Sequence, residues 1–136
     1  MPFAGRAEYE ALIYSLPDRY AGQVAASTLR LYSTSALTAK LEGSVYFVNG
    51  IELRVREFID YRHSRILDYS YALYQGETKL RWYDPQPHPE DPSLVETFPH
   101  HYHMEPDIKH NRLPAHGISF DTPNLPRLIE DCLSLS

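Results

Sequence analysis

Residues 48–59 read VNGIELRVREFI and combine the clearest turn signal of the chain with a regular strand pattern. Asn49 and Gly50 tolerate the positive φ angles of a type I′ turn, so we expect Val48 and Ile51 to face each other across a tight hairpin. Beyond the turn, aliphatic side chains occupy alternate positions, which predicts a strand with one buried face and one polar face. The stretch therefore predicts an antiparallel sheet.

Glu57 interrupts the apolar row of that strand, because it shares a face with Ile51, Leu53, Val55 and Ile59. Two interpretations fit this position. In the first, the row reaches the margin of the sheet and the carboxylate faces water. In the second, the sheet holds a site carboxylate, and a buried acid of this kind needs a partner.

Further segments extend the sheet on both sides of the turn: residues 24–32, 37–48, 66–74 and 78–83 all have the pattern of strands. Gly43 lies inside the second segment, where a glycine often marks a β-bulge. The apolar face of the third segment is expected to consist of Leu67, Tyr69, Tyr71 and Leu73.

Two helices are expected to cover this sheet. Residues 6–16 predict a short amphipathic helix that Pro17 prevents from continuing. Near the C-terminus, Asn124 suits an N-cap, and Leu125 begins an apolar stripe at i, i+3, i+4, i+7 and i+8. Cys132 belongs to that stripe, so we expect it in the core and not as a nucleophile.

These elements predict an α+β fold in a single domain over residues 1–136, with an antiparallel meander of about five strands, a short N-terminal helix, a long Pro/His-rich loop and a C-terminal helix. The hydrophobic fraction of 43% is typical of a folded domain. A net charge of −5 argues against a surface that binds polyanions as a whole, although a local basic or aromatic patch can still engage nucleic acid. A lone cysteine, no secretory signal and no long apolar run predict a cytoplasmic protein without membrane contact.

The regular alternation of apolar and polar residues stops in residues 80–103, which read LRWYDPQPHPEDPSLVETFPHHYH. Four of the seven histidines lie in this stretch, and prolines are frequent from here onward. Little regular pattern follows Asp84 for most of the way to the last helix. Because a long loop in a compact domain is either disordered or functional, we expect residues 80–123 to be a functional loop region laid on the sheet.

Metal binding is one chemistry that this stretch supports. In an extended strand His101 and His103 point to the same side, and two imidazoles at this spacing chelate a divalent ion. A carboxylate, either Glu57 or Asp84, would complete a facial set of ligands. The cofactor is therefore left open between none and a divalent metal ion.

Metal-free cleavage of a phosphodiester is the second chemistry. Two histidines can act as general base and general acid, because an imidazole pKa of about 6.5 populates both forms at neutral pH. Arg81 would stabilise the negative charge that develops on phosphorus. The expected substrate contacts are Tyr71, Tyr102 and Arg56. A third interpretation is non-catalytic, in which the histidines only order the loop by bonding to backbone groups without sheet partners.

A family resemblance rests on Leu-Arg-Trp-Tyr-Asp at 80–84, Phe-Pro-His-His-Tyr-His at 98–103 and Asn-Leu-Pro-Arg-Leu-Ile-Glu at 124–130. In this order the motifs resemble the TumE family, small prokaryotic toxins of toxin–antitoxin pairs, usually encoded beside a helix-turn-helix antitoxin. The resemblance covers almost the whole chain and implies a toxin-like role with that antitoxin as partner. One departure is Pro85, where the family usually has asparagine. The matched positions are Glu57, Tyr69, Tyr71, Arg81, Asp84, His88, His100, His101 and His103.

Together, the residues and the resemblance predict a toxin that acts on RNA. The expected catalytic residues are three histidines, one arginine and two carboxylates: His88, His100, His103, Arg81, Asp84 and Glu57. The histidines would serve as acid and base, the arginine would hold the phosphate, and a carboxylate would orient an imidazole. We expect these side chains to gather in one polar pocket. The alternatives are a non-catalytic protein-binding module and a divalent-metal-binding protein, and homo-oligomerisation is left open.

Overall fold

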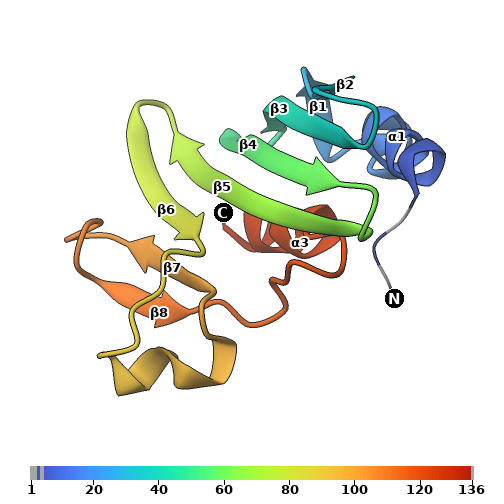
Figure 1. Cartoon of the computed structure of the whole chain (residues 1–136). Coiled ribbons are helices and arrows are strands. Elements are labelled where there is room, and N and C mark those ends of the chain that lie inside the picture. The colour runs from blue at the N-terminus through green and yellow to red at the C-terminus, as the bar shows by residue number, and fades with distance from the viewer. Residues whose placement is uncertain (1–2, 4, 136) are drawn as a thin grey trace.

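The computed structural model describes residues 3 and 5–135, which form an antiparallel sheet with helices against it (Figure 1). In chain order the elements are α1 (Arg6–Tyr14), α2 (Leu16–Arg19), β1 (Val24–Ser27), β2 (Arg30–Ser33), β3 (Thr38–Phe47), β4 (Ile51–Asp60), β5 (Arg65–Gln75), β6 (Thr78–Asp84), η1 (Pro92–Thr97), β7 (His101–Met104), β8 (Arg112–Pro114) and α3 (Leu125–Ser134). Within the described residues the sheet has eight strands in the order β1-β3-β4-β5-β6-β7-β8, and β2 pairs with β3 beside β1. The α+β class is confirmed, but the expected number of about five strands was too low.

The additional strands have two origins. The segment expected as one strand over residues 24–32 is divided into β1 and β2, which pair with different parts of β3. The stretch expected as an irregular loop supplies β7 and β8, which continue the sheet beyond β6. In Figure 1 these two strands and the 3-10 helix η1 lie at the end of the sheet farthest from α1. Part of the expected loop is therefore sheet.

Gly43 lies where β3 changes its partner from β2 to β1. The pairing of β3 with β4 has no register shift at this residue, so the expected bulge is absent there. The glycine is needed for a different reason. Its φ is +141°, and a Cβ atom would lie 2.5 Å from the carbonyl oxygen of Thr28. Close approach of the link between β1 and β2 therefore excludes any side chain at this position.

The turn between β3 and β4 is longer than the expected two residues. Phe47 ends β3 and Ile51 begins β4, and the N–H of Gly50 donates to the carbonyl oxygen of Phe47 at 3.0 Å. Gly50 has a φ of +90°, whereas Asn49 is not among the described residues with positive φ. The Asn49 amide instead donates to the carbonyl oxygens of Cys132 and Leu135, at 3.0 and 2.9 Å. Asn49 thus ties the hairpin to the end of α3.

A bulge in β5 changes which side chains are buried at its start. The pairing of β4 with β5 shifts between Phe58 and Ile59, so that Phe58 faces Asp68 and Ile59 faces Ile66. Ile66 is consequently buried, and Leu67, which was expected on the apolar face, is 44% exposed. The extra residue in β5 moves the side chains that precede it to the opposite faces of the sheet.

The hydrophobic core lies between the sheet and the helices, and α3 packs against β4 (Figure 1). The expected apolar stripe of α3 is buried at Leu125, Leu128, Ile129 and Cys132. Each large aliphatic side chain removed from water contributes about 1.5–3 kcal/mol. The core position of Cys132 is confirmed, and burial raises the pKa of its thiol to about 12.

The N-terminal helix is shorter than the expected span of residues 6–16. It ends at Tyr14, and Pro17 lies in the first turn of the separate helix α2, where a missing N–H costs nothing. In the part of the chain that the structure describes, no helix has the length and apolar composition needed to cross a bilayer.

Candidate functional site

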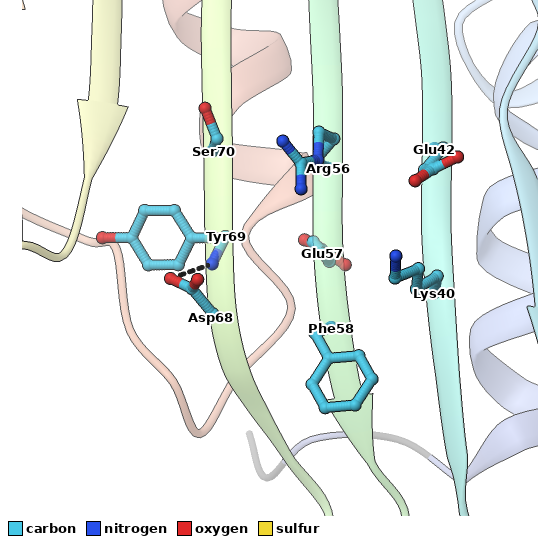
Figure 2. A pocket seen from close by; sticks show the side chains of 8 residues that line it. All are labelled: Lys40, Glu42, Arg56, Glu57, Phe58, Asp68, Tyr69 and Ser70. Atoms are coloured by element: carbon cyan, nitrogen blue, oxygen red, sulfur yellow. Dashed lines mark hydrogen bonds between the residues drawn. The ribbon is translucent and has the colours of Figure 1, made fainter. Parts of the chain in front are cut away.

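The two faces of the sheet have different environments. Along β4, Glu57 points toward the helices and is buried, whereas Arg56 points to the opposite side (Figure 2). We call that opposite side, which α1 and α3 do not cover, the open face. Opposed residues in antiparallel strands share a face, so Ser70, which pairs with Arg56, lies on the open face as well. The same rule assigns Trp82, which pairs with Ala72, to this face.

Three side chains of the open face converge where β6 pairs with β7. Asp84 lies opposite His101, and Trp82 lies opposite His103. Oδ2 of Asp84 is 2.9 Å from Nε2 of His103, and Oδ1 is 3.3 Å from Nε2 of His101. The two Nε2 atoms are 3.2 Å apart. Asp84, His101 and His103 are 7%, 1% and 4% exposed, and we call them the carboxylate–histidine cluster.

Neighbouring groups orient the cluster and cover it. Nδ1 of His101 lies 3.2 Å from the carbonyl oxygen of Pro99, which places the proton on Nδ1 and directs Nε2 at the carboxylate. Trp82 stacks on His103, with ring centroids 4.7 Å apart. His88 meets His101 edge to face at 5.0 Å. The rings of Trp82 and His88 thus hold the two imidazoles in place.

Burial and charge act in opposite directions on the cluster. Burial by itself raises the pKa of Asp84, but hydrogen bonds from His101, the Gln86 N–H and His103 bring it below the ordinary value. Burial lowers the pKa of His101, and the hydrogen bond with Asp84 more than reverses this, so that the net shift is upward. For His103 burial prevails and the pKa is lowered. The two imidazoles therefore bind a proton with different affinity although they share one carboxylate.

A groove on the open face lies beside this cluster and approaches it at Trp82. It consists of two hollows that share Arg56 and Ser70, one across β3, β4 and β5 (Figure 2) and the other reaching β6. At its β6 end, Trp82 donates from Nε1 to Oγ of Ser70 at 3.1 Å and stacks on His103. The hollow next to the cluster is lined by Arg54, Val55, Arg56, Ser70, Ala72, Tyr74, Lys79 and Trp82. The other hollow also contains the acidic residues Glu42 and Asp68.

Glu57 belongs to a separate buried network on the helix-covered face. Tyr9 of α1 and Tyr71 of β5 each donate a hydroxyl hydrogen bond to its carboxylate. Nδ2 of Asn124 donates to the Tyr71 hydroxyl at 3.0 Å, so Asn124 holds the N-cap position without capping α3. Burial raises the pKa of Glu57 to about 7, against the lowering effect of the two hydroxyls. Of the two interpretations of Glu57, the solvated one is wrong, since the residue is 3% exposed.

Arg81 and His100 also lie on the helix-covered face. The guanidinium of Arg81 lies over the ring of Tyr102 at 5.3 Å, and its Nη1 is 3.5 Å from the hydroxyl of Tyr83. Nδ1 of His100 is 2.6 Å from the hydroxyl of Tyr69, and burial lowers the pKa of His100 to about 4. The imidazole of His100 is therefore neutral at physiological pH.

The structure thus divides the expected catalytic residues between two faces. Asp84, His103 and His88 gather on the open face with His101, whereas Glu57, Arg81 and His100 do not join them. The expectation of a single pocket was wrong because side chains alternate along a strand, and Arg81 is an odd number of residues from Asp84.

The expected substrate contacts are divided in the same way. Arg56 lines the groove, but Tyr71 and Tyr102 face the helix-covered side. Trp82 and Ser70 were not expected at the site. The position of Trp82, two residues before Asp84 in β6, is the sequence signal that could have identified it.

One comparison with known proteins identifies the family. A family model described as toxin TumE matches residues 14–134, which is most of the chain. The chain belongs to the TumE toxin family. No curated protein matches the chain, and no solved structure does. As a member of a toxin family, this TumE protein is a toxin component with an antitoxin as its partner.

Proposed function

We propose that this TumE toxin cleaves RNA at the carboxylate–histidine cluster and holds the RNA strand in the open-face groove. The observation that supports the proposal is the meeting of the two features at Trp82, which lines the groove and stacks on His103. In the hollow that reaches β6, the cations Arg54, Arg56 and Lys79 suit phosphates, and the aromatic rings suit unpaired bases. Such a toxin would act in the cytoplasm, under the control of an antitoxin of the helix-turn-helix class.

In the proposed reaction, the 2′-hydroxyl oxygen of a nucleotide attacks the adjacent phosphorus, and the bond from phosphorus to the next 5′-oxygen breaks. An imidazole of the cluster accepts the hydroxyl proton. Asp84 orients the imidazoles and stabilises the positive charge that this proton brings. His88, at the margin of the cluster, donates a proton to the leaving 5′-oxygen. Arg56 supports the phosphate. The products are a 2′,3′-cyclic phosphate and a 5′-hydroxyl end.

The cover over the cluster determines how RNA would reach it. Because His101 and His103 are nearly closed to solvent, the phosphate reaches Nε2 only after Trp82 or the segment that carries His88 moves aside. A base that stacks on Trp82 in place of His103 would provide that movement with no net loss of aromatic contact. RNA binding and opening of the cluster would thus be coupled.

The same burial favours a second candidate function, a non-catalytic module that binds protein. In that alternative the histidines stabilise the pairing of β6 with β7, and toxicity follows from occupying a cellular partner. The two functions differ in what happens to RNA.

The test is to incubate single-stranded RNA with the purified toxin and to identify the ends of any fragments. The proposal expects fragments that end in a 2′,3′-cyclic phosphate, and their loss in the His88→Ala variant. A folded toxin that arrests growth but leaves RNA intact would overturn the cleavage mechanism in favour of the protein-binding module.

A further inference from the structure

The carboxylate–histidine cluster has the donor geometry of a metal site. One ligand atom each from Asp84, His101 and His103 lies within 4.8 Å of the others. A metal ion with nitrogen and oxygen ligands at about 2.0–2.1 Å separates neighbouring tetrahedral ligands by roughly 3.3 Å. The two Nε2 atoms are 3.2 Å apart, and each lies near a different oxygen of Asp84, at 2.9 Å for His103 and 3.3 Å for His101, which is close to that value. The ligand atoms therefore need little movement to share one ion.

The facing Nε2 atoms of the two imidazoles, 3.2 Å apart, can share a proton or a metal ion. When the ring of His101 is neutral and its proton is on Nδ1, toward Pro99, its Nε2 presents a lone pair to Nε2 of His103. Among the described residues, Nδ1 of His103 is buried without a hydrogen-bond partner. A proton on Nδ1 of His103 would leave two lone pairs facing each other. An ion that binds both lone pairs and the Asp84 carboxylate removes this conflict.

The pairing of strands holds the three donor residues in fixed positions. The pairing of β6 with β7 fixes the backbones of all three donors. Preorganisation of this kind reduces the entropic cost of binding an ion.

We infer that Asp84, His101 and His103 bind one divalent transition-metal ion, of which Zn²⁺ is the best match. Two imidazole nitrogens and one carboxylate oxygen suit Zn²⁺ and its first-row neighbours, whereas Mg²⁺ and Ca²⁺ prefer oxygen ligands alone. Metal binding itself does not depend on RNA. Its catalytic use deepens the proposed function and rests on it: the ion's bound hydroxide would accept the 2′-hydroxyl proton in place of an imidazole.

The test is a calorimetric titration of the chelator-treated, metal-free toxin with ZnCl₂. The wild type is expected to bind one ion per chain with a dissociation constant below about 1 µM, and His103→Ala to bind at least about 100-fold more weakly. His63→Ala is the matched control, because His63 forms an exposed pair with Asp60 at 2.7 Å. That variant should bind Zn²⁺ as the wild type does. Equal binding by His103→Ala and His63→Ala, or none by the wild type, would overturn the inference.

A second measurement does not depend on any variant being folded. Co²⁺ in a tetrahedral or five-coordinate site with histidine ligands gives visible absorption bands far stronger than those of hydrated Co²⁺. The wild type should develop these bands with one equivalent of Co²⁺ and lose them when Zn²⁺ is added. A spectrum identical to that of Co²⁺ in buffer would overturn the inference.

RNA cleavage measured with and without added Zn²⁺ separates this inference from the proposed function. Cleavage by a toxin that binds no Zn²⁺ overturns the metal site and leaves the RNA-cleaving function. Tight Zn²⁺ binding by a toxin that never cleaves RNA overturns the function and leaves the metal site.

Discussion

Oδ2 of Asp84 and Nε2 of His103 lie 2.9 Å apart across the pair formed by β6 and β7, and both residues are buried on the open face. This relationship follows from strand register. Asp84 is opposite His101, and His103 is the next residue of β7 on the same side. A buried carboxylate that contacts two imidazoles is a costly arrangement, which is typical of a functional site.

Substitution of His100 should affect stability, and substitution of His103 should affect activity. His100 bonds to Tyr69 on the helix-covered face, so His100→Ala should lower the free energy of unfolding by about 1–3 kcal/mol and keep the activity of each folded molecule. His103→Ala should abolish growth arrest. Colony counts after expression without antitoxin, together with circular dichroism of the purified variants, check both outcomes. Loss of toxicity in a folded His100→Ala protein would contradict the assignment of the two faces.

Removal of Arg56 should weaken RNA binding in a salt-dependent manner. Arg56 lines the groove, so Arg56→Ala should reduce the affinity for single-stranded RNA several-fold and the slope of log K against log salt by about 0.7–1. Fluorescence anisotropy with labelled RNA at several salt concentrations measures both quantities.

The matched control is Arg127→Ala, because Arg127 is half-exposed on α3 and pairs with Asp131 at 3.4 Å, away from the open face. Its salt slope should equal that of the wild type. Equal losses in the two variants would indicate that net charge, and not the groove, governs binding.

Glu57 should make the fold less stable as pH rises. Its pKa is about 7 in the folded protein and near 4.5 when unfolded, so the folded state holds the proton more tightly. The stabilisation from Glu57 is complete below the unfolded pKa and is lost as pH rises to the folded pKa, an effect of about 3 kcal/mol. Urea unfolding between pH 4 and pH 8 should therefore show a flatter pH profile for Glu57→Gln than for the wild type.

Glu77→Gln serves as the control for this titration, since Glu77 is exposed in the turn between β5 and β6. It should reproduce the wild-type profile. A Glu57→Gln profile that also parallels the wild type would show that Glu57 does not take up a proton on folding.

Gly43 should tolerate alanine much less well than another glycine with positive φ. A Cβ at Gly43 would meet the Thr28 carbonyl oxygen at 2.5 Å, whereas nothing lies within 4 Å of a Cβ at Gly22, where φ is +84°. We expect Gly43→Ala to lower the free energy of unfolding by at least about 3 kcal/mol and Gly22→Ala by about 1–2 kcal/mol. Chemical denaturation measures both. Similar losses would mean that φ alone, without the contact to Thr28, sets the cost.

Much of the fold follows from local pattern. Apolar residues at every second position of residues 51–59 predict β4 and its buried face. The apolar stripe from Leu125 to Cys132, with the period of a helix, predicts the buried face of α3. By contrast, β7 and β8 have four and three residues and lie among prolines. Strands this short exist because a neighbouring strand pairs with them, and no local pattern encodes that pairing.

The candidate site could be predicted in composition but only partly in geometry. Their two-residue spacing predicts that His101 and His103 lie on one side of a strand. By the same rule, Arg81 and Asp84, which are three residues apart, would lie on opposite sides. The partners of Glu57 were beyond local pattern, because Tyr9 lies 48 residues away in α1. Contacts of this length depend on how helices dock on the finished sheet.

The most direct test of the account is the initial rate of RNA cleavage by purified wild type and Asp84→Asn at equal concentration of folded protein. Asparagine keeps an oxygen for the hydrogen bond from the Gln86 N–H but loses the negative charge that faces both imidazoles. The account predicts a rate at least about 100-fold lower for Asp84→Asn. Equal rates for the two proteins would contradict a catalytic role for the carboxylate–histidine cluster.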